Sequence, residues 1–247
     1  MIKILSLTLI TQINSELNKL KKLRPLNHGE IKAIRKWFNV TYTYNSNAIE
    51  GNTLSLGETK MVIEDGLTIG GKTVREILEA KNHGKATELL FNIVDKKIDL
   101  NLELILKLHK ELLFDIDQEN AGVFRKIQVY ISGSEEKLPT AKEVPNSMKS
   151  FFKWYEENKS KLHPSTLASL AHFKFVKIHP FVYGNGRIAR LLLNLILLQN
   201  SYPVIIVPVI LRSEYITSLK NGETDFCDFT YKIILQNIKD YISMVKN

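Results

Sequence analysis

One short loop contains the residues whose types and spacing could support chemistry. His179 stands directly before Pro180, and Gly184, Asn185 and Gly186 follow a few positions later. A histidine, whose ordinary pKa is about 6.5, can accept a proton at neutral pH. Glycines allow the backbone to approach a ligand closely. The loop therefore predicts a proton acceptor beside a ligand-binding stretch of backbone.

The segment that follows this loop predicts a buried helix that opens at an anion site. From Gly186 to Gln199 the spacing is helical, and residues 191–199 are apolar on nearly all sides. A glycine loop that opens a helix directs free N–H groups and the positive end of the dipole at one point, which suits a phosphate. Arg187 and Arg190 oppose that dipole at a cost of about 0.3–1 kcal/mol each. A bound anion would offset this cost, so we predict a phosphate site.

Two simpler interpretations apply to parts of this stretch. Residues 184–189, GNGRIA, fit the dinucleotide fingerprint GxGxxA, but that motif must follow a strand. The preceding residues 164–178 are instead expected to form a helix, with Pro164 at its first position. We therefore disfavour dinucleotide binding. His172 is expected to be a packed histidine, and Phe181 is expected to anchor the loop in the core.

The remaining chain predicts an all-α protein with one short hairpin. Capping boxes Asn27–Glu30 and Ser55–Glu58 mark two helix starts. Residues 124–132, FRKIQVYIS, alternate and predict a strand or hairpin arm that turns at Gly133. Residues 204–211, VIIVPVIL, have the composition of a strand, although Pro208 counts against a central one. Helices are expected at residues 1–23, 27–49, 55–66, 74–96, 100–114, from Pro145 through Trp154, and at 164–178, 186–199, 212–220 and 226–245.

The loop resembles a known family signature. Residues 179–190, HPFVYGNGRIAR, are similar to the Fic signature HPFx(D/E)GNGRxxR. This resemblance implies the Fic fold and a protein adenylyltransferase, which transfers AMP from ATP to a hydroxyl group of a target protein. It implies that His179 is the general base. The implied phosphate-binding residues are Gly184, Asn185, Gly186, Arg187 and Arg190.

One position departs from the signature. Tyr183 stands where the family has an acidic residue that holds the magnesium bridging two phosphates. A phenol with an ordinary pKa of about 10 is neutral at pH 7 and is a poor ligand for a hard cation. The resemblance leads us to expect ATP with Mg²⁺ or Mn²⁺, whereas Tyr183 leaves the metal in question. The alternative function is a nucleotide-binding interaction module whose transfer activity is lost or altered.

The resemblance extends over about residues 40–240. It includes Gly122-x-x-Arg125, Pro139, the Trp154 helix and Arg212-x-x-Tyr215. In the family the hairpin is a flap, here about residues 124–139, which covers the nucleotide and binds the target segment as an added strand. An exposed strand edge has free N–H and C=O groups for such a partner. The implied nucleotide contacts are Ile131 on the flap and Tyr215 and Asn221 on the adenosine side.

A second motif predicts a built-in inhibitor. Glu50 is expected in the last turn of its helix, where it meets the negative end of the dipole. On its own it would be a solvated glutamate before a turn. However, residues 46–51, SNAIEG, match the family's inhibitory motif (S/T)xxxE(G/N), which implies that Ser46 and Glu50 are inhibitory and that Glu50 pairs with Arg190 at the γ-phosphate position. Such a pair would hold the enzyme off, or orient a water that removes AMP. We expect a helical region at 1–95 with this inhibitory helix, and a Fic core at 96–247.

Composition narrows the class of protein. The 247 residues are 44% hydrophobic and 24% charged, with a formal net charge of +8. The lysines are spread among acids, which favours a solvated surface over nucleic-acid binding. No stretch reaches the roughly 18 apolar residues of a membrane helix. The single cysteine, Cys227, is expected to be a packing residue and fits a cytoplasmic protein. The oligomeric state is left open, with a homo-oligomer among the alternatives.

Overall fold

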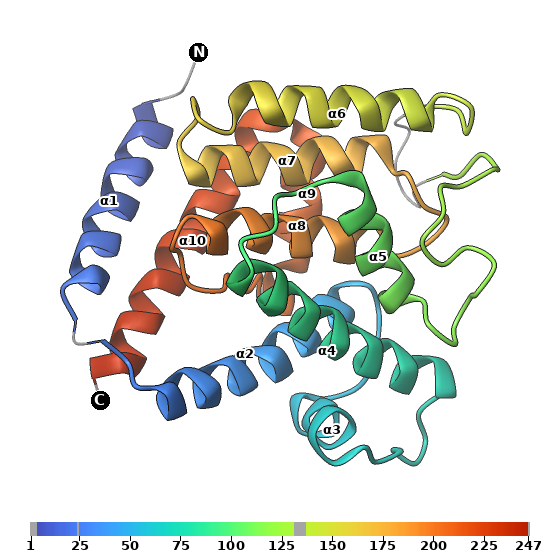
Figure 1. Ribbon diagram of the computed structural model, residues 1–247, viewed down its shortest axis with the longest axis horizontal. Helices are drawn as coiled ribbons and strands as arrows, with labels where there is room; N and C mark the ends of the chain where they lie inside the picture. Colours follow the sequence, from blue (N-terminus) through green and yellow to red (C-terminus); the bar gives the residue numbers. More distant parts are fainter. Residues whose placement is uncertain (1–3, 24, 131–136, 247) are drawn as a thin grey trace.

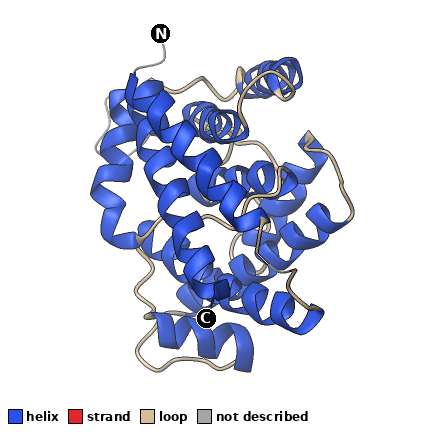
Figure 2. Ribbon diagram, turned by 90° about the vertical axis from the view of Figure 1, so that its left-hand side faces the viewer, coloured by secondary structure: helices blue, strands red, loops and turns tan. Residues whose placement is uncertain are grey.

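The computed structural model describes residues 4–23, 25–130 and 137–246, and these form helices and loops without a strand (Figures 1 and 2). The predicted all-α class is therefore confirmed. The elements are α1 (Ile4–Lys21), α2 (His28–Ile49), α3 (Leu56–Lys60), the π-helix η1 (Met61–Asp65), α4 (Val74–Asp95), α5 (Leu102–Leu112), α6 (Val144–Asn158), α7 (Pro164–Ile178), α8 (Asn185–Gln199), the 3₁₀ helix η2 (Val209–Leu211), α9 (Arg212–Asn221) and α10 (Glu223–Lys246).

Helix α8 runs through the middle of the molecule. It packs against α7, α4, α5 and α2, while α6 covers α7 and α1 packs along α10 (Figure 1). Residues 187–197 of α8 are buried without exception, as its apolar composition predicts. One hydrophobic core includes residues from Leu9 to Ile242. The expected division between residues 95 and 96 stays a prediction.

Capping residues set the starts of the helices that carry the N-terminal motif. Both predicted capping boxes, Asn27–Glu30 and Ser55–Glu58, are present. Helix α4 begins with a third box, in which Thr73 and Glu76 exchange hydrogen bonds. Each box satisfies N–H groups that the first turn of a helix leaves free. The third box sets the start of α4, and α2 ends at Ile49 with Glu50 as its C-cap.

The predicted hairpin is not confirmed. No strand occurs in residues 124–130 or 137–139, and residues 131–136, which include Ile131 and the turn at Gly133, lie outside the described residues.

Arg125 supplies the hydrogen bonds that organise the described part of this segment. Its guanidinium donates to the carbonyl oxygens of Ile127 (3.1 Å), Pro139 (2.5 Å) and His179 (2.8 Å). Its backbone N–H donates to the carbonyl of Pro180 at 2.9 Å. A side chain thus joins the two arms and ties them to the loop. Its contacts occupy carbonyl oxygens of Ile127 and Pro139 that a strand ladder could use.

Residues 204–207 are buried and belong to no helix or sheet. The side-chain amide of Asn194 donates to the carbonyl of Ile205 (2.8 Å) and accepts from its N–H (2.7 Å). Asn237 does the same for Ile206, at 3.1 and 2.9 Å. Two asparagine side chains therefore replace the neighbouring strand that such an apolar segment would require.

Replacing Asn194 by leucine should destabilise the fold. The change leaves the N–H and C=O of Ile205 buried without partners, which is expected to lower the free energy of unfolding by about 2–4 kcal/mol. Asn200→Ala is a matched control, because within the described residues its side-chain amide donates to Ile196 of α8 alone. A loss of about 1 kcal/mol or less is expected there. Urea denaturation measures both. Equal losses would show that the bridge to Ile205 contributes nothing specific.

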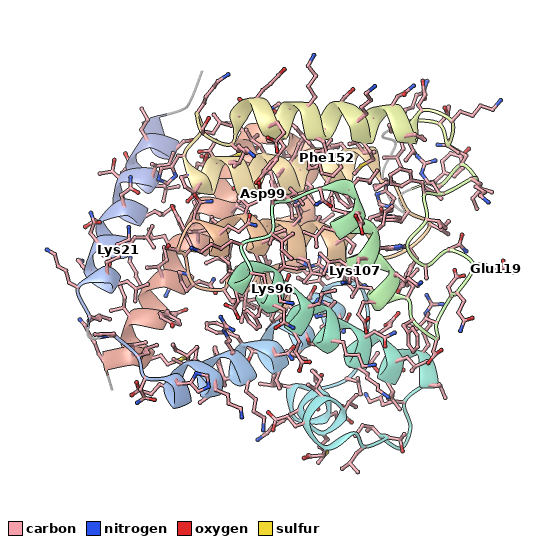
Figure 3. The ribbon with its side chains drawn as sticks, viewed as in Figure 1. Lys21, Lys96, Asp99, Lys107, Glu119 and Phe152 are labelled. Carbon is pink, nitrogen blue, oxygen red and sulfur yellow. The ribbon has the colours of Figure 1, made fainter. Side chains whose placement is uncertain are left out.

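Charged side chains are distributed over several elements. Lys21, Lys96 and Lys107 lie on separate parts of the surface, at the end of α1, after α4 and on α5 (Figure 3). The expectation of a solvated surface without one basic block stays a prediction. Within the described residues, no helix combines the length and apolar character needed to cross a membrane.

Candidate functional site

His179 ends α7 and begins the loop. Its backbone lies in the left-handed region (φ 50°, ψ 58°), which turns the chain sharply out of the helix. Ring nitrogen Nδ1 lies 3.3 Å from the carbonyl oxygen of Val176. A carbonyl only accepts, so Nδ1 carries the hydrogen and the lone pair of the neutral ring is on Nε2.

Several groups act on the pKa of His179. Burial lowers the pKa most strongly, the Val176 carbonyl raises it, the Arg125 guanidinium lowers it and the Glu50 carboxylate raises it, with a net shift below the ordinary value. The ring is therefore neutral at pH 7. A neutral imidazole with a free Nε2 lone pair is the form that accepts a proton.

Packing fixes the loop after His179. Phe181 is fully buried and stacks on His109, with ring centroids 3.6 Å apart, so its predicted role as an anchor is confirmed. The amide of Asn185 accepts from the backbone N–H of Phe181 (3.0 Å) and donates to its carbonyl (2.9 Å). Asn185 thus shapes the loop, and its direct contact with phosphate stays a prediction.

The two glycines of the loop allow close approach. Gly184 has φ +81°, a left-handed conformation that disfavours other residues, and it precedes α8 without a side-chain cap on the free N–H groups. At Gly186 a side chain would meet Oε1 of Glu50. The carboxylate of Glu50, at the end of α2, therefore lies against the first turn of α8 at Gly186. This is the end of α8 where the helix dipole favours an anion.

Arg190 binds the C-terminal end of α2. One terminal nitrogen donates to Oε1 of Glu50 at 2.7 Å and to the carbonyl of Ser46 at 2.8 Å. Its Nε donates to the hydroxyl of Ser46 at 3.0 Å. The sequence predicted the pairing of Glu50 with Arg190, and these atoms are in contact.

Burial makes this pair more than a surface contact. The side chain of Arg190 is 2% exposed and that of Glu50 is 32% exposed. Burial alone would raise the pKa of Glu50, but the guanidinium groups of Arg190, Arg187 and Arg212 lower it below its ordinary value. The carboxylate is therefore ionised near neutral pH and competes with any other anion for Arg190.

Tyr215 and His172 lie under Arg190. The hydroxyl of Tyr215 is 3.4 Å from a terminal nitrogen of Arg190 and 2.9 Å from Nε2 of His172. Both residues are buried, and His172 stacks on Phe226, as expected for a packed histidine. Tyr215 thus supports the guanidinium. Asn221 lies at the end of α9, where its amide donates to Asp225. The adenosine contacts assigned to Tyr215 and Asn221 stay predictions.

Arg187 is fully buried and incompletely paired. One terminal nitrogen lies 3.4 Å from Oδ1 of Asn47 and 3.8 Å from the carboxylate of Glu79. Its Nε and second terminal nitrogen have no hydrogen-bond partner among the described residues. Buried donors of this kind are costly unless a ligand satisfies them. This guanidinium is therefore suited to bind an anion.

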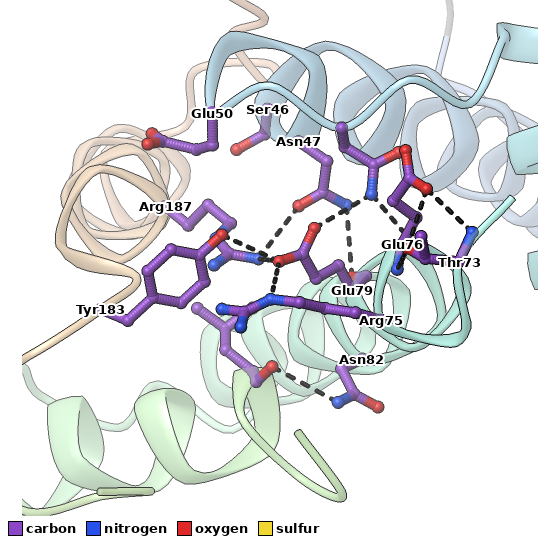
Figure 4. A network of polar contacts seen from close by, with 12 residues as sticks. Ser46, Asn47, Glu50, Thr73, Arg75, Glu76, Glu79, Asn82, Tyr183 and Arg187 are labelled. Atoms are coloured by element: carbon purple, nitrogen blue, oxygen red, sulfur yellow. Dashed lines mark hydrogen bonds and ion pairs between the residues drawn. The ribbon is translucent and has the colours of Figure 1, made fainter. Parts of the chain in front are cut away.

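Tyr183 belongs to a cluster centred on Glu79 (Figure 4). Its hydroxyl donates to Oε1 of Glu79 at 2.8 Å, and Nε of Arg75 donates to the same oxygen at 3.3 Å. The other oxygen accepts from Asn52 at 3.0 Å. The guanidinium carbons of Arg75 and Arg187 each lie 4.6 Å from the centroid of the Tyr183 ring.

This cluster does not fit a divalent cation. The side chain of Glu79 is 7% exposed, and its oxygens already accept from Tyr183, Arg75 and Asn52. Burial raises the pKa of Tyr183, which keeps the phenol neutral. In the described part of the chain no three His, Cys, Asp or Glu side chains gather as a metal site. A hard cation needs several free oxygens, which are not offered here.

Sequence reasoning missed Glu79, Arg75 and His109. His109 accepts from the N–H of Gly122 through Nδ1 (2.9 Å) and donates from Nε2 to the carbonyl of Tyr183 (3.0 Å), and it thereby holds the loop. Gly122, whose N–H donates to His109, has no room for a side chain, because a Cβ there would come within 2.9 Å of the carbonyl oxygen of Leu106. All three missed residues are ordinary helix residues in the sequence, and only tertiary packing brings them to the loop.

Comparison with known proteins agrees with this geometry. The Fic/DOC family model matches residues 99–197, which include the loop and α8. Protein adenylyltransferase fic-1 of Caenorhabditis elegans is 38% identical over 193 residues, 76% of this chain and 38% of that protein. Protein adenylyltransferase Fic of Drosophila sechellia is 37% identical over 194 residues, 78% of this chain and 39% of that protein. The chain spans about two fifths of the length of these curated relatives.

Solved structures share the whole fold. A structure of part of Fic-1 from Caenorhabditis elegans superposes with a TM-score of 0.86 at 32% identity, covering 98% of this chain and 73% of that chain. A Fic domain containing signaling protein from Bacteroides thetaiotaomicron gives a TM-score of 0.87 at 29% identity, covering 95% of this chain and 98% of that chain. The chain therefore belongs to the Fic/DOC family.

Proposed function

We propose that the chain is a protein adenylyltransferase that moves AMP from ATP to a hydroxyl group of a target protein, and that Glu50 holds it in an inactive state. The observation that carries this proposal is the neutral His179, whose Nδ1 hydrogen bond leaves the ring lone pair on Nε2, directly before a loop and an uncapped helix N-terminus that suit an anion. The names of the relatives point to the same reaction.

The residues present suggest a division of labour. Nε2 of His179 would take the proton of the target hydroxyl as its oxygen attacks the α-phosphorus. The bond from that phosphorus to the bridging oxygen would break, and pyrophosphate would leave. Arg187 and Arg190 would bind the outer phosphates and stabilise the charge that develops on them. The free N–H groups at the start of α8 would support the same charge.

The contact between Glu50 and Arg190 supports the inhibitory part of the proposal. A carboxylate and a phosphate bind a guanidinium with similar geometry, so the two cannot occupy Arg190 together. Ser46 adds two hydrogen bonds to the same side chain. The end of α2 would therefore occupy the place of the γ-phosphate. A water held by Glu50 for AMP removal remains part of the prediction.

A target segment would bind next to residues 124–139. Ile127 and Tyr130 are 59% and 86% exposed as residues, and large exposed apolar residues often contact partners. The strand-addition mode stays a prediction, as does the cytoplasmic location.

A second function, a nucleotide-binding module without transfer, is favoured by Tyr183. Its ring and hydroxyl belong to a cluster that offers no free oxygens to a metal ion. Such a module would bind ATP, and Tyr183→Asp would then create transfer where the parent chain has none. Under the proposed adenylyltransferase, a chain with intact Tyr183 transfers AMP once Glu50 is removed.

Intact-mass spectrometry separates these functions. The wild-type chain and Glu50→Gly would each be incubated with ATP and Mg²⁺ or Mn²⁺, alone and with candidate target proteins. The proposal expects the mass of an added AMP, more abundant with Glu50→Gly. ATP binding by Glu50→Gly without any added AMP, on itself or on the targets, would favour the module.

The pH dependence of His179 gives a separate test. The neutral ring is the base, so transfer should fall as pH drops through the pKa of His179, and this pKa lies below its ordinary value. Removing the Glu50 carboxylate takes away an influence that raises this pKa. Glu50→Gln should therefore shift the titration of the His179 ring protons, followed by NMR, to still lower pH. A shift to higher pH would contradict the arrangement.

A further inference from the structure

Arg75 reaches the phosphate loop from outside the family signature. It is the second residue of α4, yet its guanidinium lies as close to the Tyr183 ring as that of Arg187. Tyr183 directly precedes Gly184, where the loop turns toward α8. A third arginine therefore stands beside the position where the family signature has an acidic residue.

The side chain of Arg75 is held in place but remains accessible. Its Nε donates to Glu79 at 3.3 Å, and its guanidinium carbon lies over the ring of Tyr183, 4.6 Å from the centroid. The side chain is nevertheless 56% exposed. A guanidinium has five donors, so the contact through Nε leaves others for a ligand. Stacking on an aromatic ring restricts the guanidinium and leaves its edge free to bind phosphate.

The charges near the loop also favour a polyphosphate without a metal. Arg75, Arg187 and Arg190 face two carboxylates, Glu79 and Glu50. When Glu50 leaves Arg190, the positive charges of these three arginines outnumber the single carboxylate of Glu79, so the groups that remain attract an anion. Glu79 cannot supply the oxygens for such a cation, because Tyr183, Arg75 and Asn52 already donate to them.

We propose that Arg75, braced against the ring of Tyr183, binds the nucleotide phosphates and supplies positive charge where the family signature has a metal-binding acid, so that ATP binds without a divalent cation. This inference rests on the proposed function, because it concerns the same nucleotide site. The ring of Tyr183 provides a neutral surface for the guanidinium of Arg75. The hydroxyl of Tyr183 donates a hydrogen bond that holds the carboxylate of Glu79 in place. An aspartate at this position would instead place a second carboxylate beside Glu79 and would repel phosphate unless a cation were bound.

Calorimetric titration with ATP tests the proposal, in EDTA and in Mg²⁺, with Glu50→Gln as the parent chain so that Glu50 does not interfere. The parent should bind ATP in EDTA within about threefold of its affinity in Mg²⁺. Adding Arg75→Ala should weaken binding in EDTA about tenfold, the equivalent of 1.4 kcal/mol. Arg75→Lys, which keeps the charge but not the planar stacking, should lose less.

Arg35→Ala is the matched control. Arg35 also pairs with a carboxylate, Asp95, and stacks on an aromatic ring, Phe91. It lies 15 residues before Glu50 on α2, a distance of about 22 Å along a helix. ATP affinity should not change in this variant. Melting temperatures would show whether each variant is folded. If Arg75→Ala does not fold, the ATP affinity of Arg75→Lys in EDTA tests the role of Arg75 instead.

Tyr183→Asp provides the reciprocal test. This variant should bind ATP weakly in EDTA and gain at least about tenfold in Mg²⁺, because two adjacent carboxylates attract a cation and repel phosphate. A parent chain that binds ATP only with Mg²⁺, or an Arg75→Ala chain that binds as the parent does, would overturn the role of Arg75 and leave the proposed function intact. A parent that binds no ATP in either condition would count against both.

Discussion

Replacing His179 by alanine in a Glu50→Gln chain is expected to lower the rate of AMP transfer about 10²–10⁴-fold, the usual contribution of a general base. ATP affinity should stay nearly constant, because the proposed phosphate contacts come from the loop N–H groups and from the arginines, none of which this change removes. The transfer of label from the α-phosphate of ATP measures the rate, and calorimetry measures the affinity.

His28→Ala is the control for this change, since His28 is exposed at the start of α2. It should leave both quantities unchanged. Transfer that survives in His179→Ala at the parent rate would remove His179 from the reaction. Loss of ATP binding together with transfer would instead assign His179 to the shape of the loop.

Replacing Glu50 by glutamine should raise AMP transfer at low ATP by about 5–30-fold. Removing the carboxylate frees Arg190 for the outer phosphates, and a partly buried pair of this kind corresponds to about 1–2 kcal/mol of ATP binding. The side chain of Glu50 is 32% exposed, which places the effect below that of a fully buried pair. Label transfer at several ATP concentrations provides the measurement.

A double-mutant cycle shows whether the gain passes through Arg190. In an Arg190→Ala chain, Glu50→Gln should bring no gain, and ATP should bind weakly whether or not Glu50 is present. Glu157→Gln on α6 removes an equally charged but exposed side chain and should change nothing. A gain from Glu50→Gln that persists without Arg190 would mean that Glu50 acts on a different group.

The sequence identified the parts of the site that are local in the chain. The loop from His179 to Gly186 and the helix after it could be predicted, because glycines, a proline and an apolar run determine the conformation of the residues next to them in the chain. The pairing of Glu50 with Arg190 joins distant segments, and only the resemblance to a family motif predicted it. No local pattern could have shown that Glu50 and Gly186 share one space.

The residues that sequence reasoning missed act through tertiary contacts. Glu79 is buried because α4 packs against α8, and nothing in the spacing of α4 distinguishes it from a solvated glutamate. The strand predicted at residues 124–132 is not confirmed, since residues 124–130 contain none. The guanidinium of Arg125 takes carbonyl oxygens that a ladder would need. The β-propensity of a segment does not include a side-chain donor that competes for its carbonyl oxygens.

Competition between Glu50 and the outer phosphates for the guanidinium of Arg190 is tested most directly by titrating ATP and ADP against the wild-type chain and Glu50→Gln. ADP has one phosphate fewer and should conflict less with the carboxylate. Glu50→Gln should therefore strengthen ATP binding about 5–30-fold and change ADP binding much less, so that the preference for ATP over ADP rises. An ATP/ADP preference that is the same in both chains would contradict the inhibitory role and leave Glu50 as a structural partner of Arg190.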